Sequence, residues 1–201
     1  MTQIAIVIPA AGASRRMGAR DKLLEPVDGR PLLRGVAQRA LAVSEHVFVT
    51  LPDPASQRRD ALQGLDVSLV MVPDAKDGMS ASLRRAAAEV PEGVDGVMIL
   101  PADMPDLTVE DLQLVAQAFG DSSGAFLVQG AGRDEKPGHP VIFPADLIPA
   151  LQTLEGDNGA RAVLKANASR LIRVALPGDN ALIDLDTPDA WTLWRANNPG
   201  R

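Results

Sequence analysis

Ile4-Ala5-Ile6-Val7-Ile8 is an unbroken apolar run, mostly β-branched, that ends at Pro9 and leads into the small residues Ala10-Ala11-Gly12-Ala13-Ser14. Such a run predicts a central strand buried on both faces, because a strand with one wet face alternates apolar and polar side chains. Helical patterns fill most of the gaps between this run and similar runs at 47–49, 67–72, 97–100 and 126–128. The alternation predicts an α/β fold with a mostly parallel central sheet.

Helix starts are visible in several of these gaps. Apolar residues at helical spacing follow Pro31, and residues 79–89 are rich in alanine and arginine. Thr108 and Thr187 are suitable N-caps, the second of them followed by a proline at the first helical position. We therefore expect helices at about 31–41, at 79–89, after Thr108 and after Thr187.

The alternation lapses between Gly130 and Pro144, where glycine and proline are frequent. We expect this stretch to be an active-site loop, with residues 141–143 forming an antiparallel strand. No repeat or linker divides the 201 residues, so we expect one domain over 1–201, with a nucleotide-binding part at about 1–105 and an acceptor-binding part at about 106–201.

Composition excludes several classes of protein. The chain has no cysteine, which rules out disulfides, zinc-thiolate sites and cysteine nucleophiles. A net charge of −6 argues against a broad nucleic-acid surface. The longest apolar runs are strand-length, far below the ~20 residues of a membrane span, and the N-terminus lacks the pattern of a signal peptide. We therefore expect a cytoplasmic protein that binds neither nucleic acid nor membrane.

The loop after the first strand combines small residues with positive charge. Backbone amides of residues 10–14 can approach an anion closely, and Arg15, Arg16, Arg20 and Lys22 outnumber the single acid Asp21. This loop is neither a P-loop nor a dinucleotide fingerprint, because the required glycine spacings are missing. It predicts a triphosphate site, and a surface turn with solvated arginines is the alternative.

Acidic residues follow the strand at 97–100 and precede the last predicted helix. Asp103 lies between Pro101 and Pro105, just past a buried strand, where a turn or capping aspartate is the alternative. Asp184 and Asp186 are two residues apart, so in an extended segment they point to the same side and could share a cation. Asp186 could instead cap the following helix.

Two further segments carry polar groups that suit a ligand. Gly78, Ser80 and Ser82 at the start of a predicted helix could offer amides and hydroxyls to a base or ribose, although Ser80 could simply be an N-cap. His46 and His139 are the only histidines, too few to suggest a histidine metal site. His139, in Lys136-Pro137-Gly138-His139-Pro140, could contact an acceptor phosphate or hydrogen-bond within its loop.

The loop sequence resembles the signature of a known superfamily. Ala10-Ala11-Gly12-x-Ser14-x-Arg16-Met17-Gly18-x3-Lys22-Leu23-Leu24, followed by Gly29-x-Pro31-Leu32-Leu33, resembles the nucleotidyltransferases that make activated nucleoside-diphosphate compounds, above all the molybdenum cofactor cytidylyltransferase family of MobA-like NTP transferases. The resemblance implies a single-domain, three-layer, Rossmann-like nucleotidyltransferase fold with one antiparallel strand. Because related guanylyltransferases carry two glycines where this chain has Ala11-Gly12, it favours CTP over GTP.

The resemblance also assigns roles to residues. It implies that Lys22, Arg16 and Asp103 are catalytic and that Asp103, Asp184 and Asp186 hold Mg²⁺, with Mn²⁺ as an option. It places Arg161, in the segment 156–161, on the acceptor side together with His139. The nucleotide and acceptor contacts that it implies are Ala10, Ala11, Gly12, Ser14, Arg15, Arg16, Met17, Gly18, Lys22, Gly78, Ser80, Ser82 and His139.

The expected reaction moves CMP from CTP to the terminal phosphate of a molybdopterin-type phosphomonoester and releases pyrophosphate. Positioning and charge neutralisation dominate such transfers, so no covalent enzyme intermediate is needed. A molybdoenzyme that receives the product is a further partner to consider. The alternatives are transfer to another acceptor, such as GTP-dependent transfer to molybdopterin or transfer to a sugar or polyol phosphate, a non-catalytic nucleotide-binding module that delivers cofactor, and an α/β domain without enzyme activity.

Overall fold

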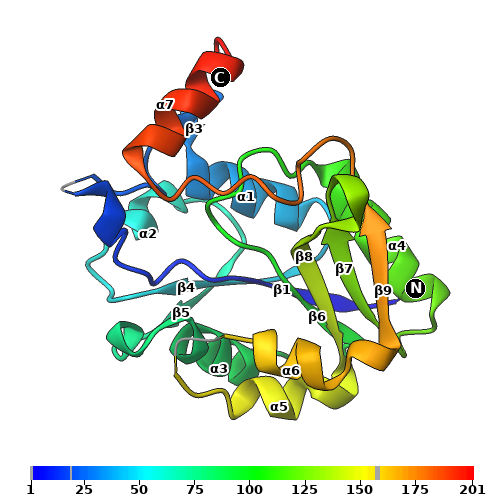
Figure 1. The fold of residues 1–201 in the computed structure, drawn as a ribbon. Coiled ribbons are helices and arrows are strands. Elements are labelled where there is room, and N and C mark those ends of the chain that lie inside the picture. Colours follow the sequence, from blue (N-terminus) through cyan, green and yellow to red (C-terminus); the bar gives the residue numbers. More distant parts are fainter. Residues whose placement is uncertain (1, 19, 157–158) are drawn as a thin grey trace.

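A seven-stranded sheet forms the middle layer of the computed structural model, which describes residues 2–18, 20–156 and 159–201 (Figure 1). The strand order is β5-β4-β1-β6-β8-β7-β9. The strands are β1 Ile4–Ile8, β4 His46–Leu51, β5 Ser68–Met71, β6 Gly96–Ile99, β7 Leu127–Ala131, β8 Pro137–Pro144 and β9 Leu171–Ala175. A separate two-stranded hairpin joins β2 Pro26–Val27 to β3 Arg30–Pro31.

β1 is buried on both faces, as its apolar sequence predicts. It pairs in parallel with β4 on one side and β6 on the other. The side chains of Ile4, Ile6 and Ile8 enter one apolar core, and those of Ala5 and Val7 enter a second core on the opposite face. The mostly parallel sheet is confirmed: in the seven-stranded sheet of the described residues, β8 runs antiparallel to β6 and β7, and the other neighbouring strands are parallel.

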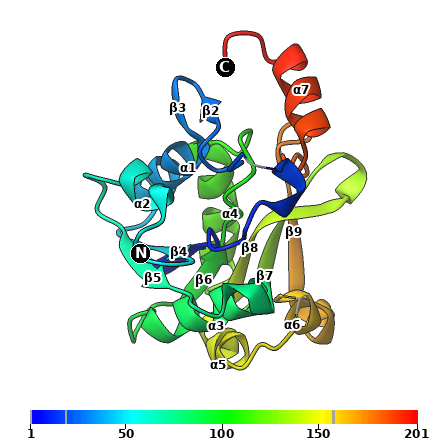
Figure 2. The same ribbon diagram turned by 90° about the vertical axis from the view of Figure 1, so that its left-hand side faces the viewer.

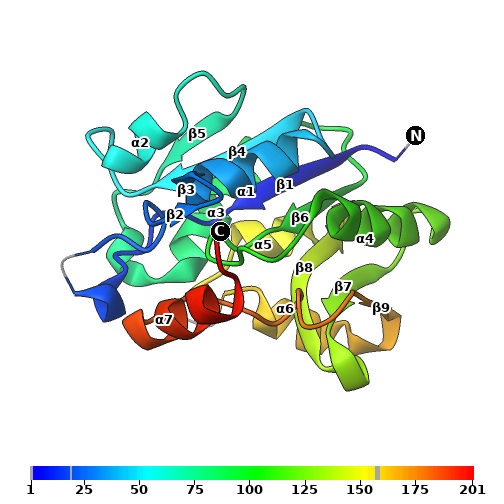
Figure 3. The same ribbon diagram turned by 90° about the horizontal axis from the view of Figure 1, so that it is seen from above.

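Helices cover both faces of the sheet, and those that the sequence predicts are present. The helices are α1 Leu32–Leu41, α2 Gln57–Ala61, α3 Met79–Glu89, α4 Val109–Asp121, α5 Ile148–Gln152, α6 Arg161–Ala166 and α7 Pro188–Asn197. α1 and α4 lie on one face and α3, α5 and α6 on the other (Figures 1 and 3). Thr108 and Thr187 cap α4 and α7 through their hydroxyls, the former in a complete capping box.

The glycine- and proline-rich stretch after Gly130 is mostly strand rather than the expected loop. β8 begins at Pro137, and only a tight turn separates it from β7. The register shifts between Gln129 and Ala131, where Gly130 lets the strands approach, because a Cβ there would lie 2.5 Å from the carbonyl oxygen of His139. The antiparallel strand predicted at 141–143 is therefore confirmed but is longer than expected. No helix among the described residues combines the length and apolar character needed to cross a bilayer.

Candidate active site

A cleft of about 670 Å³ opens at the carboxyl edge of the parallel strands, the edge that faces the viewer in Figure 2. Its walls come from the segments that follow β1, β4, β5 and β6, with single residues from β8 and from the stretch before α7. Ligands of open α/β sheets bind at this edge, because the connections diverge there and leave a crevice. The fold therefore brings four separate loops and two distant residues to one site.

Most of the predicted nucleotide contacts line this cleft. They are Ala10, Ala11, Gly12, Ser14, Arg15, Arg16, Lys22, Gly78, Ser82 and His139. Met17 instead packs in the apolar core, and the hydroxyl of the buried Ser80 donates to the carbonyl oxygen of Glu155 at 3.2 Å. Gly18 lies outside the cleft lining. The side chains of Met17 and Ser80 thus stabilise the loop and helix α3, and the predicted role of these two residues as ligand contacts stays a prediction.

The glycine-rich loop has a defined backbone shape. The N–H of Ala10 donates to the hydroxyl of Thr50 at 2.9 Å, which fixes where the loop leaves β1. Ser14 adopts a left-handed conformation, with φ 48° and ψ 32°, and a 3-10 turn over Arg15–Met17 follows. A left-handed residue next to helical ones directs successive N–H groups to one side, the arrangement that binds anions.

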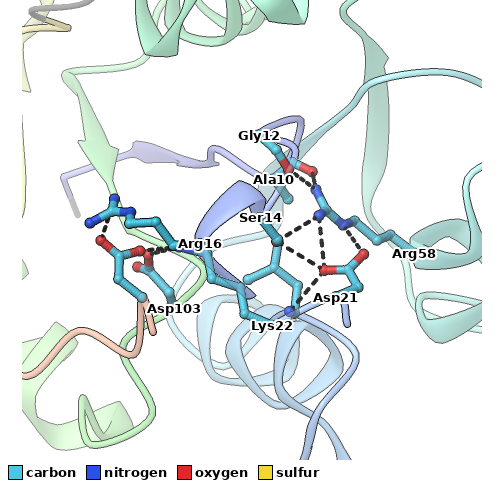
Figure 4. Close-up of polar contacts among 10 residues, drawn as sticks. Ala10, Gly12, Ser14, Arg16, Asp21, Lys22, Arg58 and Asp103 are labelled. Atoms are coloured by element: carbon cyan, nitrogen blue, oxygen red, sulfur yellow. Dashed lines mark hydrogen bonds and ion pairs between the residues drawn. The ribbon is translucent and has the colours of Figure 1, made fainter. Parts of the chain in front are cut away.

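Lys22 joins two acidic segments that are far apart in the sequence (Figure 4). Its Nζ lies 2.5 Å from Oδ2 of Asp103 and 2.5 Å from Oδ1 of Asp186. The guanidinium of Arg16 contacts the other oxygen of Asp186 at 2.7 Å. The structure therefore brings Arg16, Lys22, Asp103 and Asp186 together, as the triphosphate-and-metal hypothesis requires.

Charge explains the pKa shifts in this group. Burial disfavours the charge of Lys22, but Asp103 and then Asp186 outweigh it and raise the pKa of the ammonium. Burial likewise opposes the charge of Asp186, but Lys22, followed by Arg16, outweighs it and lowers the pKa of that carboxyl. The Lys22 and Asp186 charges are thus mutually stabilised at neutral pH.

Asp184 differs from its neighbour Asp186. It reaches solvent, but the partial burial of its carboxyl, followed by the charges of Asp186 and Asp103, raises its pKa. Leu185, between the two acids, is buried, and its N–H donates to the carbonyl oxygen of Asp103 at 3.0 Å. This backbone hydrogen bond holds the acidic segment before α7 against the loop after β6.

The three acids are not assembled as a finished metal site. Among residues 2–18, 20–156 and 159–201, no three His, Asp or Glu side chains are arranged to hold a metal ion, and the Lys22 ammonium lies between Asp103 and Asp186. The donor chemistry nevertheless suits a divalent cation. Carboxylate oxygens are the ligands that Mg²⁺ and Mn²⁺ prefer. Burial, and then the charges of Asp186 and Asp103, raise the pKa of Asp184, and Lys22 opposes them only in part.

His139 borders the cleft next to Asp103. Burial lowers its pKa, with the nearby charge of Asp103 acting in the opposite direction, so the imidazole is neutral at physiological pH. Within the described part of the chain its buried Nδ1 has no hydrogen-bond partner. Its backbone N–H donates to the carbonyl oxygen of Ala181 at 2.9 Å. The imidazole therefore has an unused polar atom beside the cleft.

The proposed acceptor segment at 156–161 is described only in part. Arg161 begins α6, is exposed and does not line the cleft. Asp157 and Asn158 lie outside the described residues. The adjacent start of α3 contributes two residues to the lining of the cleft: Gly78, with φ 95°, and Met79, which is 51% exposed.

Arg58 is the main functional candidate that sequence reasoning missed. It lies on α2, is 4% exposed, and hydrogen-bonds to the loop after β1 and to Asp21. Its only sequence signal is position: it belongs to the segment after a parallel strand, where ligand-binding residues gather. An arginine in the polar stretch Gln57-Arg58-Arg59-Asp60 otherwise reads as a solvated helix face.

Known proteins share both the sequence pattern and the fold. Residues 6–171 match the MobA-like NTP transferase domain. The chain belongs to the MobA-like NTP transferase family. It is thus a nucleotidyltransferase, and proteins of this family use divalent metals.

Relatives of this MobA-like chain cover nearly its whole length. It is 32% identical to the molybdenum cofactor guanylyltransferase of Cereibacter sphaeroides over 91% of each chain, and 29% identical to the purine catabolism protein PucB of Bacillus subtilis over 94% of each. Among solved structures, Rv0371c of Mycobacterium tuberculosis aligns with a TM-score of 0.80 at 27% identity, covering 96% of this chain and 97% of that one. A manganese complex of Rv0371c aligns with a TM-score of 0.74, also at 27% identity and over the same shares of the two chains.

Proposed function

We propose that this MobA-like nucleotidyltransferase transfers CMP from CTP to the terminal phosphate of a molybdopterin-type phosphomonoester and releases pyrophosphate. The observation that carries the proposal is the cluster of Arg16, Lys22, Asp103 and Asp186 beside a small-residue loop on a 670 Å³ cleft. Cations and oriented amides are what a triphosphate and a developing phosphate charge require. We further propose that residues up to about 105 bind the nucleotide and that later residues bind the acceptor.

The residues of the chain take distinct parts in this reaction. Amides of the loop after β1 hold the triphosphate, Arg16 holds the departing pyrophosphate, and Lys22 neutralises charge that develops at the α-phosphate. Asp103, with Asp184 or Asp186, would hold the divalent ion, which supplies further neutralisation of phosphate charge when bound. His139, which lines the cleft, would hydrogen-bond the acceptor phosphate through its neutral imidazole. The acceptor phosphate oxygen attacks the α-phosphorus of CTP in line, and the bond between that phosphorus and the departing pyrophosphate breaks.

CTP is proposed on the Ala11-Gly12 pair. Ala11 lines the cleft, and its buried methyl group packs against Val72 and Ala81, where a glycine would leave additional space. GTP is the second candidate, because the Cereibacter sphaeroides relative is named as a guanylyltransferase. Thermal unfolding with CTP, GTP, ATP or UTP and Mg²⁺ distinguishes them, since a ligand at a hundredfold excess over its dissociation constant stabilises the folded state by about 2.7 kcal/mol. Stabilisation by GTP alone would overturn the CTP proposal.

Activity is tested by pyrophosphate release from the preferred nucleotide and a molybdopterin-type acceptor. Asp103→Ala should abolish metal-dependent release while its unfolding transition stays cooperative. Asp66→Ala, which removes an exposed carboxylate before β5, is the control and should behave as the unaltered protein does. Normal turnover in Asp103→Ala would reject the metal role, and absence of release from the unaltered protein with every nucleotide and acceptor would favour a non-catalytic module.

A further inference from the structure

Arg58 directs all three of its guanidinium nitrogens at the glycine-rich loop and its flank (Figure 4). Nη1 donates to the carbonyl oxygens of Ala10 at 2.5 Å and Gly12 at 2.7 Å. Nη2 donates to the hydroxyl of Ser14 at 3.2 Å and to Oδ1 of Asp21 at 2.8 Å, and Nε donates to Oδ2 of Asp21 at 2.6 Å. A guanidinium has five N–H groups in a fixed plane, and five hydrogen bonds are formed here.

We propose that Arg58, paired with Asp21, is a positioning residue that holds the glycine-rich loop in its triphosphate-binding shape. The inference rests on the proposed function, because it assigns the loop to nucleotide phosphates. Arg58 would act without touching the substrate: it is 4% exposed, and its hydrogen-bonding capacity is already used within the protein.

The conformation of Ser14 is the first argument for this role. A residue other than glycine at φ 48° is disfavoured and persists only when its surroundings impose it. The Ser14 hydroxyl accepts from Arg58 and donates to Oδ1 of Asp21 at 3.3 Å. These two contacts fix the residue whose left-handed geometry turns successive N–H groups toward one side.

The carbonyl groups of the loop are the second argument. A peptide that binds phosphate through its N–H must keep its C=O away from the anion, because the carbonyl oxygen carries partial negative charge. Arg58 holds the carbonyl oxygens of Ala10 and Gly12, so neither is free to turn into the cleft. Since Ala10 also donates its N–H to Thr50, both polar groups of this residue are fixed from outside the loop.

Asp21 extends the same network to the catalytic lysine. One carboxylate oxygen of Asp21 accepts from Nη2 of Arg58 and also from the N–H of Leu23 at 3.0 Å. Lys22 lies between Asp21 and Leu23 in the sequence. The network therefore joins the start of the loop, at Ala10 to Ser14, to its end at Lys22, and sets the distance between the phosphate amides and the ammonium.

The test compares Arg58→Lys with Arg59→Lys. The lysine at 58 keeps the charge but loses the planar five-bond geometry, so we expect kcat/KM for the nucleotide to fall by about 10²-fold, the cost of a small misplacement of binding groups. The loss should appear mainly in the nucleotide KM, with the acceptor KM unchanged. Arg59 is exposed, contacts the carbonyl oxygen of Pro54 at 3.5 Å and should tolerate the same change without effect.

A second measurement separates this inference from the proposed function. Amide hydrogen exchange of residues 11–18 in the nucleotide-free protein should quicken at least tenfold in Arg58→Lys while exchange in the β1 and β6 strands stays unchanged. If the unaltered protein released no pyrophosphate, the proposed function would fail, but the exchange result would still test the positioning role. Asp21→Asn, which keeps an acceptor oxygen but removes the charge, serves if Arg58→Lys does not fold. Unaltered loop exchange together with an unaltered nucleotide KM in either variant would overturn the proposal.

Discussion

Replacing Lys22 by methionine should destabilise the ligand-free protein and lower its turnover, because the Lys22 ammonium pairs with both Asp103 and Asp186. Removing one partner from a fully buried ion pair costs about 3–5 kcal/mol. Here the side chains of the lysine and the two acids remain 16, 18 and 22% exposed, so water screens part of the lost interaction. We therefore expect the free energy of unfolding to fall by about 2 kcal/mol.

That loss corresponds to about 4–8 °C in the midpoint of thermal unfolding for a chain of this size. Turnover at saturating nucleotide should fall by about 10²- to 10³-fold, the effect of losing one charge-stabilising donor. Mn²⁺ without nucleotide should stabilise Lys22→Met more than the unaltered protein, because the cation need not compete with the ammonium for Asp103 and Asp186. Lys165→Met, on the exposed side of α6, is the matched control.

Urea unfolding, followed by tryptophan fluorescence, and pyrophosphate release together check this prediction. An unchanged urea midpoint in Lys22→Met would show that the ammonium does not hold the two carboxylates together in solution. Turnover close to that of the unaltered protein would show that Lys22 does not act on the phosphates. Equal stabilisation of both proteins by Mn²⁺ would show that the Lys22 ammonium does not compete with the cation for Asp103 and Asp186.

Three further predictions follow from the same region. Asp184→Asn should raise the free energy of unfolding at neutral pH by up to about 0.5 kcal/mol, because partial burial, followed by the charges of Asp186 and Asp103, raises the pKa of the carboxyl that is removed. The same change should weaken Mn²⁺ binding in calorimetry. The pKa of Asp186 lies below its ordinary value of 3.8, so its charge should contribute stability above pH 3.8, and this stability should be lost as the pH falls through the lowered pKa. The urea midpoints of Asp186→Asn and the unaltered protein should therefore converge in acid. A difference that stays constant with pH would contradict this. Gly138→Ala should cost about 1–3 kcal/mol in urea unfolding, because a Cβ there would collide with the backbone carbonyl of Ala181; an unchanged midpoint would mean that the two segments separate easily.

The central part of the fold follows directly from the sequence. The unbroken apolar runs around Ile4–Ile8 and at β4 and β6 predict buried parallel strands, and Thr108 and Thr187 mark the starts of α4 and α7. β9 was missed because only Leu171, Ile172 and Val174 are partly buried in it, and an edge strand of this kind lacks a continuous apolar run.

The strand at β8 was hidden for a different reason. Prolines and glycines indicate a loop, but Pro137 and Pro140 lie where β7 shifts register, and Gly130 makes room for the backbone of His139. Proline is tolerated at such irregular positions because a ladder hydrogen bond is already missing there. Local pattern cannot reveal this, since the tolerance depends on the neighbouring strand.

In the candidate site, too, some residues can be predicted from the sequence and others depend on contacts formed only in the fold. Arg16, Lys22, Asp103 and Asp186 are predictable because each lies just after a strand or in an acidic pair, and the structure brings them into direct contact. The ammonium between the two acids is not predictable, since it depends on how the lysine side chain reaches across the cleft. Arg58 is equally hidden, because its partners are carbonyl groups and an aspartate that no spacing rule connects to it.

The contact between Lys22 and Asp186 spans 164 positions of the chain. During synthesis, the ribosome therefore releases the lysine long before the aspartate that completes its surroundings, and the sheet strands β1, β4 and β6 can pair while the site is still unfinished. A nascent polypeptide arrested before residue 186 would carry the sheet strands, but it would lack Asp186 and the core residues Trp191 and Trp194 of α7. Cutting the protein between β9 and α7 and mixing the two fragments would, for the same reason, restore turnover only where the short fragment docks again.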